Sequence, residues 1–159
     1  MPQADPITIL LVDDEEMVLT SIKSFLAIET DYNVLTYTSP TKALRELDHQ
    51  NVDLVISDYL MPDMDGITFL GRVKEKYPQV PRILLTGYAD KENAIKAIND
   101  VGLYQYIEKP WNNDDLKLII RNGLEKTVLL RKLEEKIREV ERAQRELSDV
   151  QKQILKIFA

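Results

Sequence analysis

The first element of the chain reads Ile7-Thr8-Ile9-Leu10-Leu11-Val12, and this run stops at two aspartates, Asp13 and Asp14. A short, nearly continuous apolar run rich in β-branched residues is typical of a strand that is buried on both faces, as in a parallel sheet. Downstream, apolar residues recur at helical spacing over 18–26. The stretch therefore predicts a buried strand followed by an amphipathic helix.

The same alternation of strand and helix recurs along the chain. Further strands are predicted at 34–37, 54–56, 82–85 and 106–107, with a helix after each and the last helix beginning near Asn112 or Asn113. Five β-α units predict an α/β fold: a flavodoxin-like, doubly wound, five-stranded parallel sheet with five helices, the last extended into a coiled coil. We choose the strand order 2-1-3-4-5, which periodicity alone does not determine.

The helix expected after the fourth strand shows how local signals set boundaries. Asp90 is placed to cap its start, and Gly102 is placed for the left-handed residue that ends many helices. The spacing of Ala94, Ile95 and Ile98 predicts that these three side chains face the core.

The length and composition bound the kind of protein. With 159 residues, 44% hydrophobic and 30% charged, we expect one domain at 1–125 and a helical extension at 126–159. The absence of cysteine excludes disulfides and thiolate metal sites and fits a reducing cytoplasm. No apolar run approaches the ~20 residues of a membrane span, and the N-terminus does not resemble a secretory signal.

The charge is unevenly distributed. Residues 126–159 carry nine Lys and Arg against six Asp and Glu, a net charge of +3. Because the whole chain has a net charge of −6, residues 1–125 have a net charge of −9. Contacts to phosphates of nucleic acid need a cationic surface. We therefore expect no direct nucleic-acid binding by the globular part.

Polar side chains follow four of the predicted strands where each ends: Asp13 and Asp14, Asp58, Thr86, and Lys109. In doubly wound sheets these ends share one edge, where ligands bind. Clustered carboxylates repel unless a cation lies among them, and all-oxygen ligands favour Mg²⁺ or Mn²⁺ over zinc. Each residue alone could be a helix cap, a turn former or a solvated lysine. Their joint occurrence favours a site for a phosphoryl group.

These residues carry a resemblance to a known family. Asp13-Asp14, Asp58 with Met61-Pro62 and Met64-Asp65-Gly66, Thr86-Gly87, and Tyr106 with Lys109-Pro110 make residues 7 to about 125 similar to the receiver domain of bacterial two-component response regulators. The resemblance implies that Asp58 accepts a phosphoryl group from a sensor histidine kinase or phosphotransfer protein. It also implies that Asp14, Asp58 and the backbone carbonyl of Leu60 ligate Mg²⁺, with Asp13 acting through water.

The resemblance further implies how the signal is passed on. Lys109 and Thr86 would hold phosphoryl oxygens, and Tyr106 would rotate inward as the switch residue. The change would leave through the face made by the fourth helix, the fifth strand and the fifth helix. Tyr104, expected on the same strand face, is read as a packing residue.

Two positions are expected to tune the lifetime of the phosphoryl group. Leu60 and Tyr88 flank the expected path of attacking water, and their bulk predicts slow self-dephosphorylation. No other catalytic activity is expected of this domain.

The tail has a heptad pattern. The a positions are Leu130, Ile137, Gln144, Gln151 and Phe158, and the d positions are Leu133, Val140, Leu147 and Ile154. Such a narrow seam, with Gln at two a positions, favours a parallel homodimer over a helix folded back on its own domain. We also expect an output domain beyond residue 159, and the Tyr-x-x-Lys-Pro-Trp pattern at 106–111 resembles receivers joined to enzymatic outputs.

Other readings of the site are possible. A phosphatase of the haloacid-dehalogenase type needs a second carboxylate two residues after its nucleophile, where this chain has Leu60. A flavodoxin-like nucleotide or flavin module needs a glycine-rich loop after the first strand, where this chain has acidic residues. A scaffold that has lost phosphorylation would not need the intact acidic, threonine and lysine positions.

Overall fold

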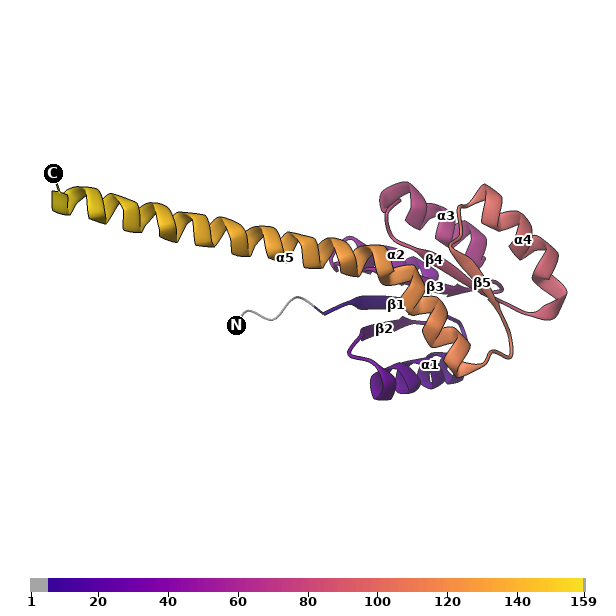
Figure 1. The fold of residues 1–159 in the computed structure, drawn as a ribbon. Coiled ribbons are helices and arrows are strands. Elements are labelled where there is room, and N and C mark those ends of the chain that lie inside the picture. The colour runs from indigo at the N-terminus through magenta and orange to yellow at the C-terminus, as the bar shows by residue number, and fades with distance from the viewer. Residues whose placement is uncertain (1–5, 159) are drawn as a thin grey trace. The chain divides into compact units, whose positions relative to one another are not determined.

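A computed structural model of the protein describes residues 6–158, apart from the side chain of Tyr88. Its sheet has five parallel strands in the order β2-β1-β3-β4-β5, which confirms the predicted topology (Figure 1). The strands are β1 (Thr8–Val12), β2 (Asn33–Tyr37), β3 (Leu54–Asp58), β4 (Arg82–Thr86) and β5 (Gln105–Glu108).

Five α-helices and one short 3-10 helix lie within the described residues. They are α1 (Glu16–Glu29), α2 (Pro40–Leu47), α3 (Gly66–Lys76), η1 (Tyr88–Asp90), α4 (Lys91–Asp100) and α5 (Asn113–Phe158). The start of α5 is set by Asn112, whose side-chain oxygen accepts hydrogen bonds from the backbone N–H groups of Asp114 and Asp115. None of these helices is long and apolar enough to cross a bilayer.

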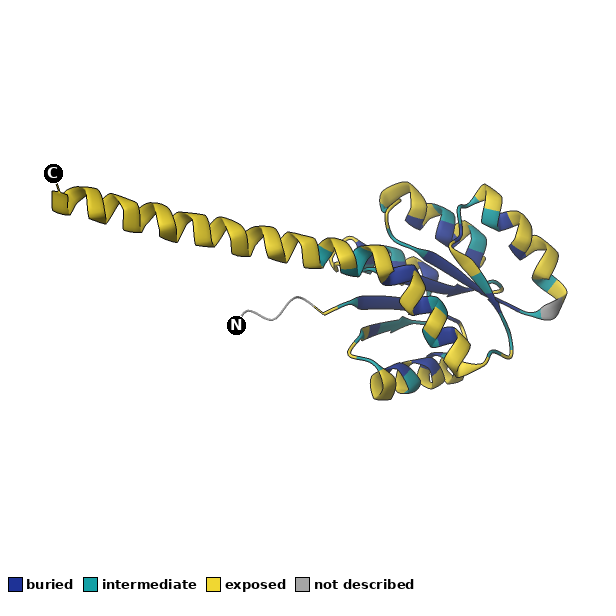
Figure 2. Ribbon diagram, viewed as in Figure 1, coloured by how far each residue is buried: buried dark blue, intermediate teal, exposed yellow. Residues whose placement is uncertain are grey.

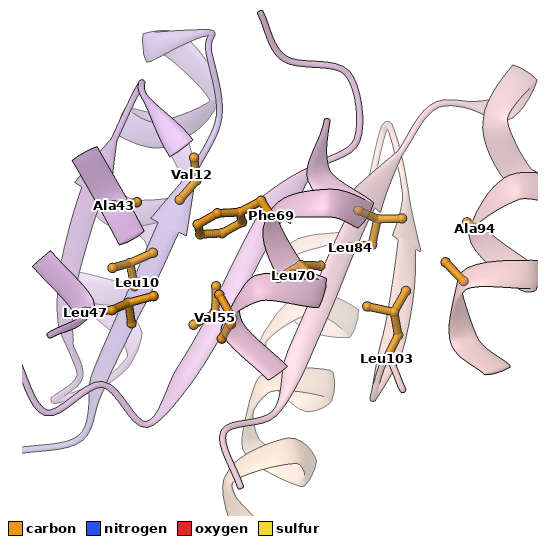
Figure 3. Close-up of a cluster of buried hydrophobic side chains, with 12 residues drawn as sticks. Leu10, Val12, Ala43, Leu47, Val55, Phe69, Leu70, Leu84, Ala94 and Leu103 are labelled. Atoms are coloured by element: carbon orange, nitrogen blue, oxygen red, sulfur yellow. The ribbon is translucent and has the colours of Figure 1, made fainter. Parts of the chain in front are cut away.

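One face of the sheet is covered by α2, α3 and α4. Side chains from alternate strand positions, Leu10 and Val12 on β1 and Val55 on β3, meet Phe69 and Leu70 of α3 there (Figure 3). Because successive strand residues point to opposite faces, the side chains of the intervening apolar residues pack on the other face of the sheet. That face is covered by α1 and the first turns of α5. Their buried residues are Leu19, Ile22, Leu26, Leu116, Ile120, Gly123 and Leu124.

Helix α4 departs from the prediction in two details. Asp90 is its N-cap residue but makes no side-chain capping hydrogen bond. Ala94 and Ala97 are the buried residues of the helix, whereas Ile95 is 46% exposed. The inward stripe is therefore made of Ala94 and Ala97, with Ile98 half-buried against the core, so Ile95 is the one predicted inward residue that is misplaced. Gly102 has φ 66, which confirms the left-handed stop.

The chain divides into two compact units, residues 1–124 and 125–159. The first contains the sheet with α1 to α4 and the first part of α5. The second is the remainder of α5, and nearly all of its residues are exposed (Figure 2). The predicted long helix is confirmed, and its pairing into a coiled coil stays a prediction.

Candidate functional site

The parallel sheet brings four of its strand ends to one edge. Val12 pairs in register with Ser57, so Asp13 follows β1 beside Asp58, the last residue of β3. Thr86, the last residue of β4, pairs with Glu108, which directly precedes Lys109. The predicted site residues from distant parts of the sequence thus meet because strand polarity and register align their ends.

Three carboxylates form a cluster at this edge. Ligand oxygens of Asp13, Asp14 and Asp58 all lie within 4.8 Å of one another, with Asp13 and Asp58 buried and Asp14 exposed. An all-oxygen set with one member open to solvent fits a hard dication that keeps some of its waters, such as Mg²⁺. The acidic cluster is therefore suited to hold this ion.

Lys109 joins the two buried carboxylates. Its Nζ lies 3.1 Å from Asp13 Oδ2 and 3.0 Å from Asp58 Oδ1. The backbone positions it, because Lys109 N–H donates to the carbonyl oxygen of Thr86 at 2.8 Å. A cis peptide bond links Lys109 to Pro110. One fixed cation therefore lies between two acids that are 45 residues apart in the sequence.

The site disfavours the ionised form of its two buried carboxylates. Burial raises the pKa of Asp13, and the nearby charge of Asp58 raises it further, while a hydrogen bond from the Glu15 N–H opposes both. Burial also raises the pKa of Asp58, and Lys109 only partly offsets it. Burial lowers the pKa of Lys109, but its bonds to Asp58 and its attraction to both acids outweigh this and raise it. The edge thus favours added positive charge.

The backbone holds the Asp58 carboxylate in place. The Tyr59 N–H donates to Asp58 Oδ1 at 3.0 Å, and the Ser57 hydroxyl donates to the Asp58 carbonyl at 2.9 Å. Gly66, the first residue of α3, donates its N–H to the Tyr59 carbonyl at 2.7 Å. A Cβ atom at Gly66 would overlap the Asp58 carbonyl oxygen. Only glycine permits this close approach of α3 to the strand end.

The roles of Ser57 and Gly66 were not predicted from sequence. Gly66 belongs to the loop motif that carries the resemblance, and its place directly after the helix cap Asp65 is the one available signal. The sequence contains no indication of what lies against it. Ser57 is one residue of a buried strand, and its hydroxyl bonds to its own chain neighbour.

Thr86 and Tyr106 are near the site without bonding to the carboxylates. Thr86 is buried, and its hydroxyl donates to the Gly87 carbonyl at 3.0 Å. Tyr106 is half-buried and packs against the core beneath α2, α3 and α4. Tyr104 is exposed, and its ring lies 3.3 Å from where a Cβ of Gly123 on α5 would be. Tyr104 and Tyr106 were expected on one strand face, but Tyr104 precedes β5, which begins at Gln105, and the two rings have different neighbours.

Leu60 and Tyr88, the two positions expected to tune the lifetime of the phosphoryl group, follow the ends of β3 and β4. The Leu60 side chain is 61% exposed, two residues beyond the end of β3. Tyr88 opens the short helix η1, and its side chain lies outside the described part of the structure.

Comparison with known proteins identifies the family. The family model for the response regulator receiver domain matches residues 9–121. The chain belongs to the response regulator receiver domain family. Receiver domains of this family are phosphoacceptors in two-component signalling, are generally not enzymes, bind Mg²⁺ and interact with histidine kinases. The phosphatase and scaffold alternatives are not favoured.

Individual relatives of the chain are also transcriptional or response regulators. The chain is 37% identical over 118 residues to the hydrogenase transcriptional regulatory protein HoxA of Cupriavidus necator, covering 74% of this chain and 24% of HoxA. It is 38% identical over 127 residues to a putative NtrX-like response regulator of Rickettsia bellii, covering 79% of this chain and 26% of the relative. This receiver chain thus spans about a quarter of the length of these two relatives.

Solved structures show the same fold. The chain superposes with a TM-score of 0.73 on a response regulator receiver domain from Clostridium thermocellum, at 36% identity, covering 78% of this chain and 98% of that one. It matches the signal receiver domain of an HD domain-containing protein from Pseudomonas fluorescens Pf-5 with a TM-score of 0.72 and 40% identity, over 76% of this chain and 96% of that one.

Proposed function

We propose that this receiver domain accepts its phosphoryl group on Asp58. The observation that supports the proposal is the position of the Asp58 carboxylate, which ends β3 at the sheet edge, 3.0 Å from Lys109 Nζ and grouped with two other acids. In the reaction, a carboxylate oxygen of Asp58 forms a bond to phosphorus as the phosphorus–nitrogen bond of a donor phosphohistidine breaks. The electron pair of that bond stays on the imidazole nitrogen, and the chain gains an acyl phosphate.

Asp13, Asp14, Asp58 and the backbone carbonyl of Leu60 would hold Mg²⁺, with Mn²⁺ as an alternative ion. Bound there, the ion supplies positive charge that offsets the repulsion between carboxylate and phosphoryl oxygens. The exposed position of Asp14 suits an ion that arrives from solvent with its waters.

Lys109 and Thr86 would respond to the new group. The Lys109 ammonium, already bound to Asp13 and Asp58, can also donate to a phosphoryl oxygen. The Thr86 hydroxyl would leave the Gly87 carbonyl and donate to another phosphoryl oxygen. Tyr106 would then turn inward, and the change would pass through α4, β5 and α5. The exposed Leu60 and the bulky Tyr88 would keep self-dephosphorylation slow.

The partners follow from the family and the charge distribution. The donor would be a sensor histidine kinase or a phosphotransfer protein, and the domain would work in the cytoplasm without membrane or direct nucleic-acid binding. Residues 1–125 would form the receiver, and 126–159 a helical extension that dimerises and leads to an output domain. The greater length of the relatives supports a further domain in the whole protein.

Phosphorylation with acetyl phosphate and Mg²⁺ tests the proposal. Intact-mass measurement should show one added phosphoryl group on the wild-type chain and none on Asp58→Asn. Asp48→Asn is a matched control, because Asp48 is an exposed acid after the last residue of α2, remote from the strand-end edge. Equal labelling of Asp58→Asn, or an unchanged mass of the wild type, would refute the assignment.

A further inference from the structure

The second unit, residues 125–159, exposes a regular stripe of aliphatic side chains. Their exposed fractions lie between 47% and 60%, and all occupy a or d positions of the heptad: Leu130, Leu133, Ile137, Val140, Leu147 and Ile154. Aliphatic stripes of this length on a charged helix mark an interaction surface. The width and period of the stripe fit another helix.

The first layer of this stripe contains a hollow of about 340 Å³. It is lined by Glu125, Lys126, Leu129, Leu130 and Leu133. In heptad terms the last four are a d residue, a g residue, an a residue and the next d residue. In a parallel coiled coil, this set of four forms the hole that receives an a-position side chain of the facing helix. The side chain in register with this hole is Leu130 of a second copy.

The charges that flank the stripe select a parallel partner. In parallel helices a g residue faces the e residue five positions later on the other chain. Lys136 is at g and Glu141 is at e, so each copy would set a lysine against a glutamate twice across the pair. Two heptads later, Val150 at g would face Leu155 at e, and both are exposed apolar residues.

An antiparallel pair would lose this match. If Leu130 were stacked on Ile154 of the second copy, the two Glu141 side chains would face each other across the seam. Lys136 would then face Val150 of the second copy. Like charges opposed in this way disfavour the pairing.

We propose that residues 126–158 pair with the same segment of a second copy, parallel and in register. Leu130 of each copy fills the hollow of the other, and Lys136 of each copy binds Glu141 of the other. This specifies the dimer of the proposed function, but the pairing itself does not require a phosphoryl group on Asp58.

Disulfide formation tests the orientation and the register. The chain has no cysteine, so a single Leu133→Cys substitution introduces the one thiol. In a parallel in-register pair the two thiols face each other at a d layer, and mild oxidation should crosslink most of the protein. Arg142→Cys, at the outward f position, is the matched control and should crosslink poorly. No crosslink at residue 133, or equal crosslinking at both positions, would overturn the proposal.

A charge-exchange cycle tests the proposed contact. Lys136→Glu and Glu141→Lys should each raise the dimer dissociation constant, measured by sedimentation, about three- to thirtyfold, and the double variant should restore it. Lys136 also contacts Glu139 within its own helix, at 3.3 Å. The double variant still lacks that contact, so its recovery would come from the other chain. Arg142→Glu is the control for charge reversal alone. Additive losses in the double variant would overturn the contact.

Both experiments are run with and without beryllium fluoride and Mg²⁺, and each variant is also labelled with acetyl phosphate. A chain that labels normally but is monomeric under both conditions refutes the pairing and leaves the Asp58 assignment intact. A chain that crosslinks at residue 133 but does not label refutes the Asp58 assignment and leaves the pairing intact.

Discussion

Gly66 at the start of α3 and Asp58 at the end of β3 are in such close contact that any side chain at Gly66 would collide with the Asp58 backbone. The atom that a Cβ would overlap is the carbonyl oxygen of Asp58. The proposed phosphoacceptor is thus held by a glycine that takes no part in the chemistry. This relationship makes the geometry of the site sensitive to a residue outside the acidic cluster.

Gly66→Ala should therefore be strongly destabilising. We expect urea denaturation to show a loss of about 2 kcal/mol or more, because the added methyl group must displace backbone. Gly71→Ala in the same helix is the matched control: a Cβ there would meet nothing within 4 Å, and alanine should stabilise the helix by about 0.5–1 kcal/mol. Equal effects of the two substitutions would argue against the close approach.

Lys109→Gln should slow phosphorylation by acetyl phosphate about a hundredfold, because it removes the donor that lies between two buried acids. Rates of mass increase would measure this. Lys117→Gln is the control, since Lys117 is a partly exposed lysine that also pairs with a carboxylate, Glu29, at 3.2 Å. An unchanged rate in Lys109→Gln would remove this lysine from the proposed site.

Leu60→Asn should shorten the lifetime of the phosphorylated protein. The Leu60 side chain is 61% exposed, so the substitution should leave the fold unchanged while giving water better access to the acyl phosphate. We expect hydrolysis to become about tenfold faster, a change of about 1.4 kcal/mol in the barrier. Loss of label over time gives the rate. A lifetime of seconds for the wild-type chain itself would contradict the assigned role of Leu60.

A pH effect is expected at the other end of the domain. The Tyr77 hydroxyl donates to Asp48 Oδ1 at 2.7 Å, and Lys76 lies 3.1 Å from Oδ2; together they hold the pKa of Asp48 below its usual 3.8. A depressed carboxyl pKa stabilises the fold above the unfolded-state pKa. This stabilisation is lost as the pH falls through the lower, folded-state value.

Tyr77→Phe should raise the pKa of Asp48 toward 3.8 and reduce the dependence of stability on pH in that acidic window. Carboxyl NMR titration of Asp48 and unfolding at several pH values would measure both. An Asp48 pKa that stays the same in the variant would show that the hydrogen bond does not set it.

Much of the fold could be predicted because local patterns and topology agree. Apolar runs marked the strands, Gly102 marked the end of α4, and Asn112 marked the beginning of α5. Ile95 could not be placed correctly, since its spacing suits burial but the sheet meets α4 at Ala94 and Ala97. Tyr104 was misplaced for a similar reason, because the sequence does not show where β5 begins.

The order of residues along this chain alone determined that acids, a threonine and a lysine follow buried strands, and that the tail repeats every seven residues. These are properties of neighbours in sequence, and local geometry converts them into strand ends and a helical stripe. Only the tertiary structure decided that Lys109 lies within 3.1 Å of both Asp13 and Asp58, and that Gly66 is closed against the Asp58 carbonyl. The Lys109 contacts join segments far apart in the chain, and the Gly66 contact closes the short loop between β3 and α3. Both depend on strand register and helix packing, which no local pattern specifies.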